Sequence, residues 1–182
     1  RSRMLDFEPR RIVLIKPSAL GDIVHSLPVL TALRDRYPAA QISWIVNRLY
    51  EPLLRNHPHL DAVIPFDRHG GGNYFAAGLD FTRFLRLLQR GRFDLAIDLQ
   101  GLLRTGLMAF ATHARARIGL ASAREGATWF YTQRVDDLQD GQHAVDRYWR
   151  GAKARGADGG EKRFHVPLDD DARTWARSLL QQ

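Results

Sequence analysis

Short apolar runs alternate with longer stretches of helical periodicity along most of the chain. The runs are rich in β-branched and aliphatic residues and predict strands at 12–15, 41–46, 62–66 and 95–98, and the segments 117–119 and 133–135 resemble short late strands. Apolar positions at helical spacing predict helices at 20–37, 50–56, 79–89, 102–112, 143–154 and 170–180. Strands that alternate with helices imply right-handed crossovers and therefore parallel pairing. The pattern predicts an α/β fold: a doubly wound, mostly parallel Rossmann-like sheet with strand 12–15 central and strand 95–98 beside it.

The length of 182 residues fits one domain with flanking segments. Residues 1–11 are charged and lack a long apolar run, so they predict a disordered leader. The Rossmann-like domain is expected at 12–160, and a final strand and helix at 161–182. Three successive glycines predict that 68–74 is the most mobile internal loop, because glycine loses more entropy on ordering than any other residue.

The composition excludes several classes of protein. The chain has no cysteine, so it holds neither disulfides nor a thiolate metal site. No apolar run reaches the roughly 18 residues of a membrane-spanning helix. The net charge of +7 would suit nucleic acid, anionic lipid or a phosphorylated substrate. The arginines are scattered, and no helix-turn-helix, RRM or OB-fold pattern is present, so nucleic acid is the least favoured partner.

The loop between the first predicted strand and helix carries the clearest candidate chemistry. Its one glycine, Gly21, is too few for the dinucleotide fingerprint, and a Walker pattern is absent. The loop offers instead Asp22, in the first helical turn, where the helix dipole favours an ionised carboxylate. Such a group can accept a proton from an attacking hydroxyl or can satisfy free backbone N–H groups, and position alone leaves both roles open. Lys16 and Ser18 flank the loop, and His25 follows one turn later.

Four sequence blocks point to one known family. Lys-Pro-Ser-Ala-Leu-Gly-Asp-Ile-Val-His-Ser-Leu-Pro at 16–28 closely resembles the opening motif of heptosyltransferases, glycosyltransferase family 9. Further motifs of that family match Phe-Asp-Leu-Ala-Ile-Asp-Leu-Gln-Gly-Leu at 93–102, Ser-Ala-Arg-Glu at 122–125 with Phe-Tyr at 130–131, and Gln-His-Ala-Val-Asp-Arg at 142–147. These blocks occur in the family's order and span most of residues 11–150, so together they are far more specific than any one of them.

The resemblance implies the amino-terminal half of a GT-B glycosyltransferase. In that class two Rossmann-like domains face each other across a cleft: the first receives the acceptor and the second holds the ADP-heptose donor. Transfer would be inverting, to a sugar hydroxyl of the lipopolysaccharide core, and would need no metal ion and no cofactor. Asp22 would be the general base, with its carboxylate in the open cleft and not paired with Arg or Lys. Lys16 and Ser18 would order the loop, and Gly21 would let the backbone approach a sugar closely.

The resemblance also assigns acceptor contacts. Arg124 matches a family arginine that contacts the anionic acceptor. Its planar guanidinium group is suited to binding a phosphate or carboxylate. The alternative is a purely structural role, in a salt bridge to a nearby acid. Gln100 and Gly101 would lie beside the cleft. Close relatives carry a dense Arg/Lys cluster after the third strand, where this chain keeps only Arg68 and His69, so a less anionic acceptor would fit. Structural or supporting roles are expected for His25, Asp98, His143 and Arg147.

The expected partners follow from the same resemblance. They are an anionic glycolipid acceptor and a sugar-nucleotide donor, which a domain absent from this sequence would hold. The expected location is cytoplasmic, and the resemblance allows peripheral contact with the cytoplasmic face of the inner membrane. The chain alone is expected to be inactive. A stand-alone module that binds an anionic glycan or nucleotide is the alternative, and a reading frame that continues past Gln182 into another βα domain would exclude it.

Overall fold

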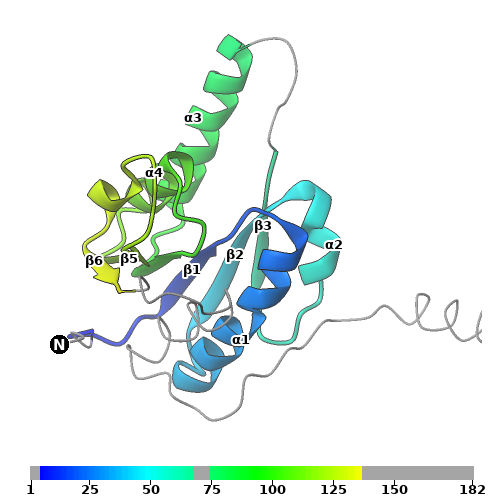
Figure 1. Cartoon of the computed structure of the whole chain (residues 1–182). Helices are drawn as coiled ribbons and strands as arrows, with labels where there is room; N and C mark the ends of the chain where they lie inside the picture. The colour runs from blue at the N-terminus through cyan, green and yellow to red at the C-terminus, as the bar shows by residue number, and fades with distance from the viewer. Residues whose placement is uncertain (1–4, 68–73, 137–182) are drawn as a thin grey trace, which may run out of the picture.

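The computed structural model describes residues 5–67 and 74–136, which are built around a six-stranded sheet (Figure 1). The strands are β1 (Arg11–Ile15), β2 (Gln41–Asn47), β3 (Ala62–Phe66), β4 (Leu95–Asp98), β5 (Ala116–Leu120) and β6 (Gln133–Val135). Their order is β3-β2-β1-β4-β5-β6, and every neighbouring pair is parallel. The predicted α/β sheet, its six strands and the central β1 beside β4 are therefore confirmed.

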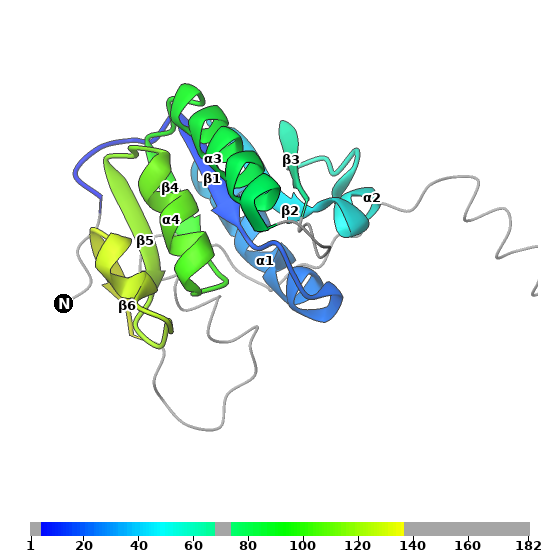
Figure 2. The same ribbon diagram turned by 90° about the horizontal axis from the view of Figure 1, so that it is seen from above.

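Helices cover both faces of this sheet. They are α1 (Leu20–Arg36), α2 (Glu51–Leu54), α3 (Tyr74–Arg90) and α4 (Leu103–Ala111), with the 3₁₀ turns η1 (Arg48–Tyr50) and η2 (Ala127–Phe130). Figure 2 shows α3 and α4 on one face and α1 on the opposite face. This is the doubly wound arrangement that the alternation of strands and helices predicted.

The central strand explains why its sequence is continuously apolar. Ile12 and Leu14 belong to the core that packs under α1, whereas Val13 and Ile15 belong to the core under α3 and α4. All four side chains are fully buried. A parallel strand that is covered on both faces shows an unbroken apolar run and no alternation with polar residues.

The chain before β1 differs from the prediction. The sequence predicted a disordered leader through residue 11, but Leu5 and Phe7 pack against the core and Arg11 opens β1. The Arg115 guanidinium carbon lies 4.6 Å from the Phe7 ring centroid, and an Arg115 nitrogen lies 2.7 Å from an Asp6 oxygen. Two apolar side chains in a charged stretch are thus enough to hold the part of the leader that the structure describes.

Two helix boundaries also differ. Helix α3 begins at Tyr74, five residues before the predicted start, and the predicted helix at 50–56 is the turn η1 followed by the short α2. The loop 68–73, the helices predicted at 143–154 and 170–180, and the segment 161–182 lie outside the described residues.

The strand order reverses direction at β1. The chain builds β2 and β3 on one side of β1 and then crosses, through α3, to β4 on the other side. The loops that follow β1 and β4 therefore leave the sheet side by side at its carboxyl edge, toward opposite faces. Such a switch point is where open α/β sheets bind their ligands.

Candidate active site

The loop after β1 presents a buried lysine to an exposed carboxylate. Lys16 is 2% exposed, and two hydrogen bonds of 3.2 Å fix its backbone. Its N–H donates to the Ile45 carbonyl, and its carbonyl accepts from the Trp44 indole N–H. Its Nζ donates to Oδ2 of Asp22 at 3.1 Å, and the Asp22 side chain is 43% exposed. A buried ammonium needs a counter-charge, which Asp22 provides.

This geometry corrects one expectation about Asp22. The sequence predicted an exposed carboxylate without a basic partner, and the structure shows an exposed carboxylate paired with Lys16. The pairing uses Oδ2, whereas no hydrogen bond from residues 5–67 or 74–136 reaches Oδ1. Helix α1 begins at Leu20 with Ala19 as its cap, so Asp22 does not serve as the capping residue. The site therefore keeps one carboxylate oxygen open.

The loop after β4 meets the loop after β1. The Gln100 side-chain oxygen accepts from the Ser18 N–H at 3.4 Å, and the Leu99 N–H donates to the Ile15 carbonyl at 3.0 Å. These contacts join residues that are more than 80 positions apart in the sequence. The structure thus brings Lys16, Ser18, Asp22 and Gln100 together at the carboxyl edge.

Asp98 is the buried centre of the second loop. One carboxylate oxygen accepts from the Gln100 and Gly101 N–H groups at 2.9 and 3.0 Å, and the other accepts from the Tyr131 hydroxyl at 2.7 Å. Burial raises the pKa of Asp98, and these hydrogen bonds oppose that rise. Burial and the adjacent Asp98 charge raise the pKa of Tyr131 far above its usual range, so its hydroxyl stays a donor. These contacts fit the supporting role expected of Asp98.

Gly101 connects this loop to the one that carries Arg124. Its φ of +73° is a left-handed conformation, and an added Cβ would lie 3.1 Å from the Ala123 Cβ. Its carbonyl accepts from the Arg124 N–H at 2.8 Å. The Arg124 side chain is exposed, and no acid in the described part of the chain pairs with it. The salt-bridge alternative for Arg124 therefore finds no support among these residues.

Of the remaining predicted site residues, two belong to the first turns of α1 and the others lie outside the described residues. His25 lies in α1 with a buried Nδ1 that has no hydrogen-bond partner in the described residues. Gly21 is exposed, with open space where a Cβ would lie. Arg68, His143 and Arg147 lie outside the described residues.

Sequence reasoning missed a cavity next to these loops. It has a volume of about 480 Å³ and lies between α3 and the end of β3, and its lining includes Arg48, Phe66, Asp67, Arg83 and Arg104. Arg48 pairs with Asp67 at 2.8 Å, and Arg83 pairs with Asp80 at 3.1 Å. Arg104 has no acidic partner among the residues described, and its guanidinium carbon lies 5.9 Å from the Phe66 ring centroid.

A signal for Arg104 was present in the sequence. Arg104 lies in the first turn of α4, where the helix dipole disfavours a cation. An arginine at that position therefore suggests a role other than helix stability. Glu125 provides the expected complement there, because its carboxylate accepts from the Leu103 N–H at 3.2 Å.

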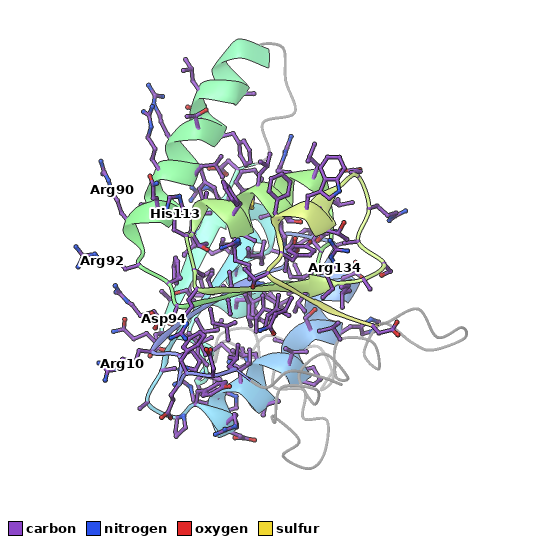
Figure 3. The ribbon with its side chains drawn as sticks, turned by 90° about the vertical axis from the view of Figure 1, so that its left-hand side faces the viewer. Arg10, Arg90, Arg92, Asp94, His113 and Arg134 are labelled. Atoms are coloured by element: carbon purple, nitrogen blue, oxygen red, sulfur yellow. The ribbon has the colours of Figure 1, made fainter. Side chains whose placement is uncertain are left out.

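Positive charge is not confined to this edge. Figure 3 shows Arg10, Arg90 and Arg92 pointing outward near Asp94, at the edge where the strands begin. The Arg10 and Arg11 N–H groups donate to the Asp94 carboxylate. Among the described residues there is no group of three or more His, Cys, Asp or Glu that could hold a metal ion, and no helix long and apolar enough to cross a membrane.

The all-parallel sheet, with paired loops at the carboxyl edge where its strand order reverses, defines a Rossmann-like α/β domain. The sequence profile of glycosyltransferase family 9 (heptosyltransferase) matches residues 81–177. The chain belongs to glycosyltransferase family 9. It is 33% identical over 142 residues to lipopolysaccharide heptosyltransferase 1 of Pseudomonas aeruginosa, a match that covers 75% of this chain and 40% of that protein.

Two solved structures show the same fold. A family 9 glycosyltransferase from Veillonella parvula superposes with a TM-score of 0.82 at 22% identity, over 98% of this chain and 50% of that one. The Escherichia coli heptosyltransferase WaaC with ADP-2-deoxy-2-fluoro heptose gives a TM-score of 0.72 at 25% identity, over 88% of this chain and 56% of that one. The chain spans between 40% and 48% of the length of the first curated relatives that it matches.

Proposed function

We propose that the chain is the acceptor-binding half of an inverting glycosyltransferase that transfers heptose from ADP-heptose to a sugar hydroxyl of the lipopolysaccharide core. The observation that carries this proposal is the Asp22 carboxylate, held by the buried Lys16 and open to solvent at the carboxyl edge of the sheet. Family membership and the length of the relatives support it, since the chain corresponds to about half of such an enzyme.

In the proposed reaction Asp22 is the general base. Lys16 holds Oδ2, so Oδ1 is the oxygen that faces an incoming acceptor hydroxyl. The hydroxyl oxygen forms a bond to the anomeric carbon while the bond from that carbon to ADP breaks, and the electron pair leaves with ADP. The proton passes to Oδ1. A carboxylate of ordinary basicity suffices, because the hydroxyl becomes acidic only as its new bond forms.

The acceptor would be held by groups around this carboxylate. Arg124 is exposed and free of acidic partners in the described residues, so it is available to a phosphate or carboxylate. Arg104 offers a second cation at the mouth of a cavity lined by Phe66 and Phe81, which suits a ligand with both anionic and apolar parts. The other domain of the full enzyme would hold the ADP-heptose, so we propose no cofactor for this half.

The outer surface of α3 fits peripheral contact with an anionic membrane, and the proposed location is the cytoplasmic face of such a membrane. Leu79 and Leu87 are 46% and 55% exposed, and Arg83, Arg86 and Arg90 are exposed on the same side of the helix. Basic residues near an anionic bilayer each contribute about 1 kcal/mol of binding. A glycolipid acceptor embedded in that membrane would then lie near the carboxyl edge of the sheet, where α3 begins.

The test is Asp22→Asn in a full-length enzyme that contains this chain. The amide keeps the shape of the side chain and removes its basicity. We expect ADP release in the presence of acceptor to fall by about 10²- to 10⁴-fold, the usual contribution of a general base. Donor binding and the melting temperature should stay close to the wild-type values, because Asp22 is exposed and caps no helix.

Asp35→Asn is the matched control, since it makes the same change at an exposed position of the same helix, at the opposite edge of the sheet. Near wild-type turnover in Asp22→Asn would contradict the proposal and would make His25 the next candidate base. A large loss of stability together with the loss of activity would assign Asp22 a structural role.

A further inference from the structure

A buried hydrogen bond joins the end of β4 to the residue that follows η2. The Tyr131 hydroxyl donates to Oδ2 of Asp98 at 2.7 Å. Asp98 is fully buried and Tyr131 is 8% exposed, so neither side chain can touch a substrate in the cleft. Oδ1 of Asp98 accepts two backbone N–H groups and Oδ2 accepts from Tyr131, while the Thr105 side chain also contributes a hydrogen bond to the carboxylate.

The sheet makes room for this contact. Gly119 in β5 is paired with Asp98 in β4. A Cβ at Gly119 would lie 2.2 Å from the Tyr131 ring, so the ring crosses β5 at the one residue without a side chain. A glycine inside a strand weakens that strand and often marks the close approach of another group. Here the group that approaches is Tyr131.

Three loops converge on the buried carboxylate. Asp98 fixes the Gln100 and Gly101 N–H groups directly. Gln100 then holds the Ser18 N–H in the loop that leads to Asp22, and Gly101 holds the Arg124 N–H. The Arg124 backbone thus reaches Asp98 through Gly101, and the loop that carries Asp22 reaches it through Gln100 and Ser18.

We propose that Tyr131 and Asp98 form a positioning pair that sets the acceptor site by fixing the loop at 98–102 between the Asp22 loop and the Arg124 loop. The inference rests on the proposed function, since it names what holds the same site in place. The burial of both groups makes the pair rigid: an unpaired oxygen of a buried carboxylate is costly, so the Asp98 side chain and the loop that wraps it keep one conformation.

Tyr131→Phe in the full-length enzyme tests this proposal, because it keeps the ring and removes only the hydroxyl. We expect the N–H groups of Gln100, Gly101 and Arg124 to exchange with solvent about tenfold faster, as the loop loses one charge-assisted hydrogen bond. The KM for the acceptor should rise by a similar factor, whereas the KM for ADP-heptose should not change. Tyr37→Phe is the control: it makes the same deletion at a buried tyrosine at the end of α1.

Asp98→Asn in the Tyr131→Phe background keeps the proposal testable if the single variant folds poorly. The amide oxygen can still accept the two backbone N–H groups, and no charge is left without a partner. We expect this double variant to recover part of the acceptor KM and part of the amide protection.

Two results would overturn the proposal: unchanged exchange at the three amides, or faster exchange with an unchanged acceptor KM. Failure of the proposed function gives a different pattern. In that case wild-type enzyme shows no transfer, or Asp22→Asn retains it, whatever the exchange rates in Tyr131→Phe.

Discussion

Lys16 shows how a single residue can be singled out by its sequence while its contact stays hidden. The motif placed Lys16 and Asp22 in one loop, and the expectation was an unpaired carboxylate. The side chain of Lys16 is instead 2% exposed, and its ammonium finds its counter-charge on Asp22. Spacing along a loop does not say which way a long side chain turns, so the residue types were predictable and the ion pair was not.

Asp98 allows a prediction on the dependence of stability on pH. Burial raises its pKa in the folded chain above the unfolded value of about 3.9. The folded chain therefore holds this proton more tightly, and the free energy of unfolding falls as pH rises from about 4 through the folded pKa. Asp98→Asn removes this dependence. We expect the stability of the variant minus that of wild type to increase over this window and then to level off.

Urea unfolding of both proteins between pH 4 and pH 8 measures that difference, in which the titration of all other carboxyl groups cancels. A difference that stays flat or decreases with pH would mean that the hydrogen bonds to Asp98 outweigh its burial. The pKa of the carboxyl would then not be raised, in contradiction to the prediction.

At the level of elements, strands were predicted better than boundaries. The central strands β1 and β4 appeared in the sequence as largely apolar runs, because burial on both faces leaves little room for polar residues. Strand β6 was predicted as well, although Val135 is its only buried residue. The start of α3 was missed, since the glycines before it obscure where helical spacing begins. The contact of Tyr131 with Asp98 was also missed, because it joins residues 33 positions apart and depends on a glycine in a third segment.

The turn after β4 gives a prediction for an element. Gly101→Ala places a side chain at φ of +73° and within 3.1 Å of the Ala123 Cβ. A left-handed conformation costs a non-glycine residue about 1–2 kcal/mol. We expect the free energy of unfolding to fall by about that amount or somewhat more, together with loss of amide protection at Arg124, whose N–H is held by Gly101.

Gly78→Ala is the matched control for this change. Gly78 lies in α3 with nothing within 4 Å of an added Cβ, so alanine there should stabilise the helix by about 0.5–1 kcal/mol. Equal effects of the two substitutions in thermal or urea unfolding would contradict the role assigned to the Gly101 turn.

At the scale of the whole molecule, the residues of the proposed acceptor site gather at one edge of the sheet. Asp22, the proposed base, and the exposed Arg124 belong to loops on the carboxyl side of one sheet, and the cavity of about 480 Å³ lies between α3 and the end of β3. The two solved structures, a family 9 glycosyltransferase and a heptosyltransferase, match this chain over 50–56% of their lengths. The proposed function therefore places the donor site in the remainder of such an enzyme, and acceptor recognition in the part described here.

The proposal that this half binds the acceptor and lacks the donor site predicts how the isolated 182-residue chain behaves. We expect it to bind a phosphorylated core oligosaccharide saturably in calorimetry, and to transfer no heptose when ADP-heptose is added. Arg124→Gln should weaken that binding by about 10-fold or more, the cost of losing a charged hydrogen-bonding group. Arg134→Gln is the control, because it removes the same charge at an exposed position of β6.

Heptose transfer by the isolated chain would contradict the half-enzyme assignment. Equal binding by all three proteins would remove Arg124 from the acceptor site. A natural reading frame that ends at Gln182 would favour the stand-alone binding module, for which saturable binding without transfer would be the whole activity.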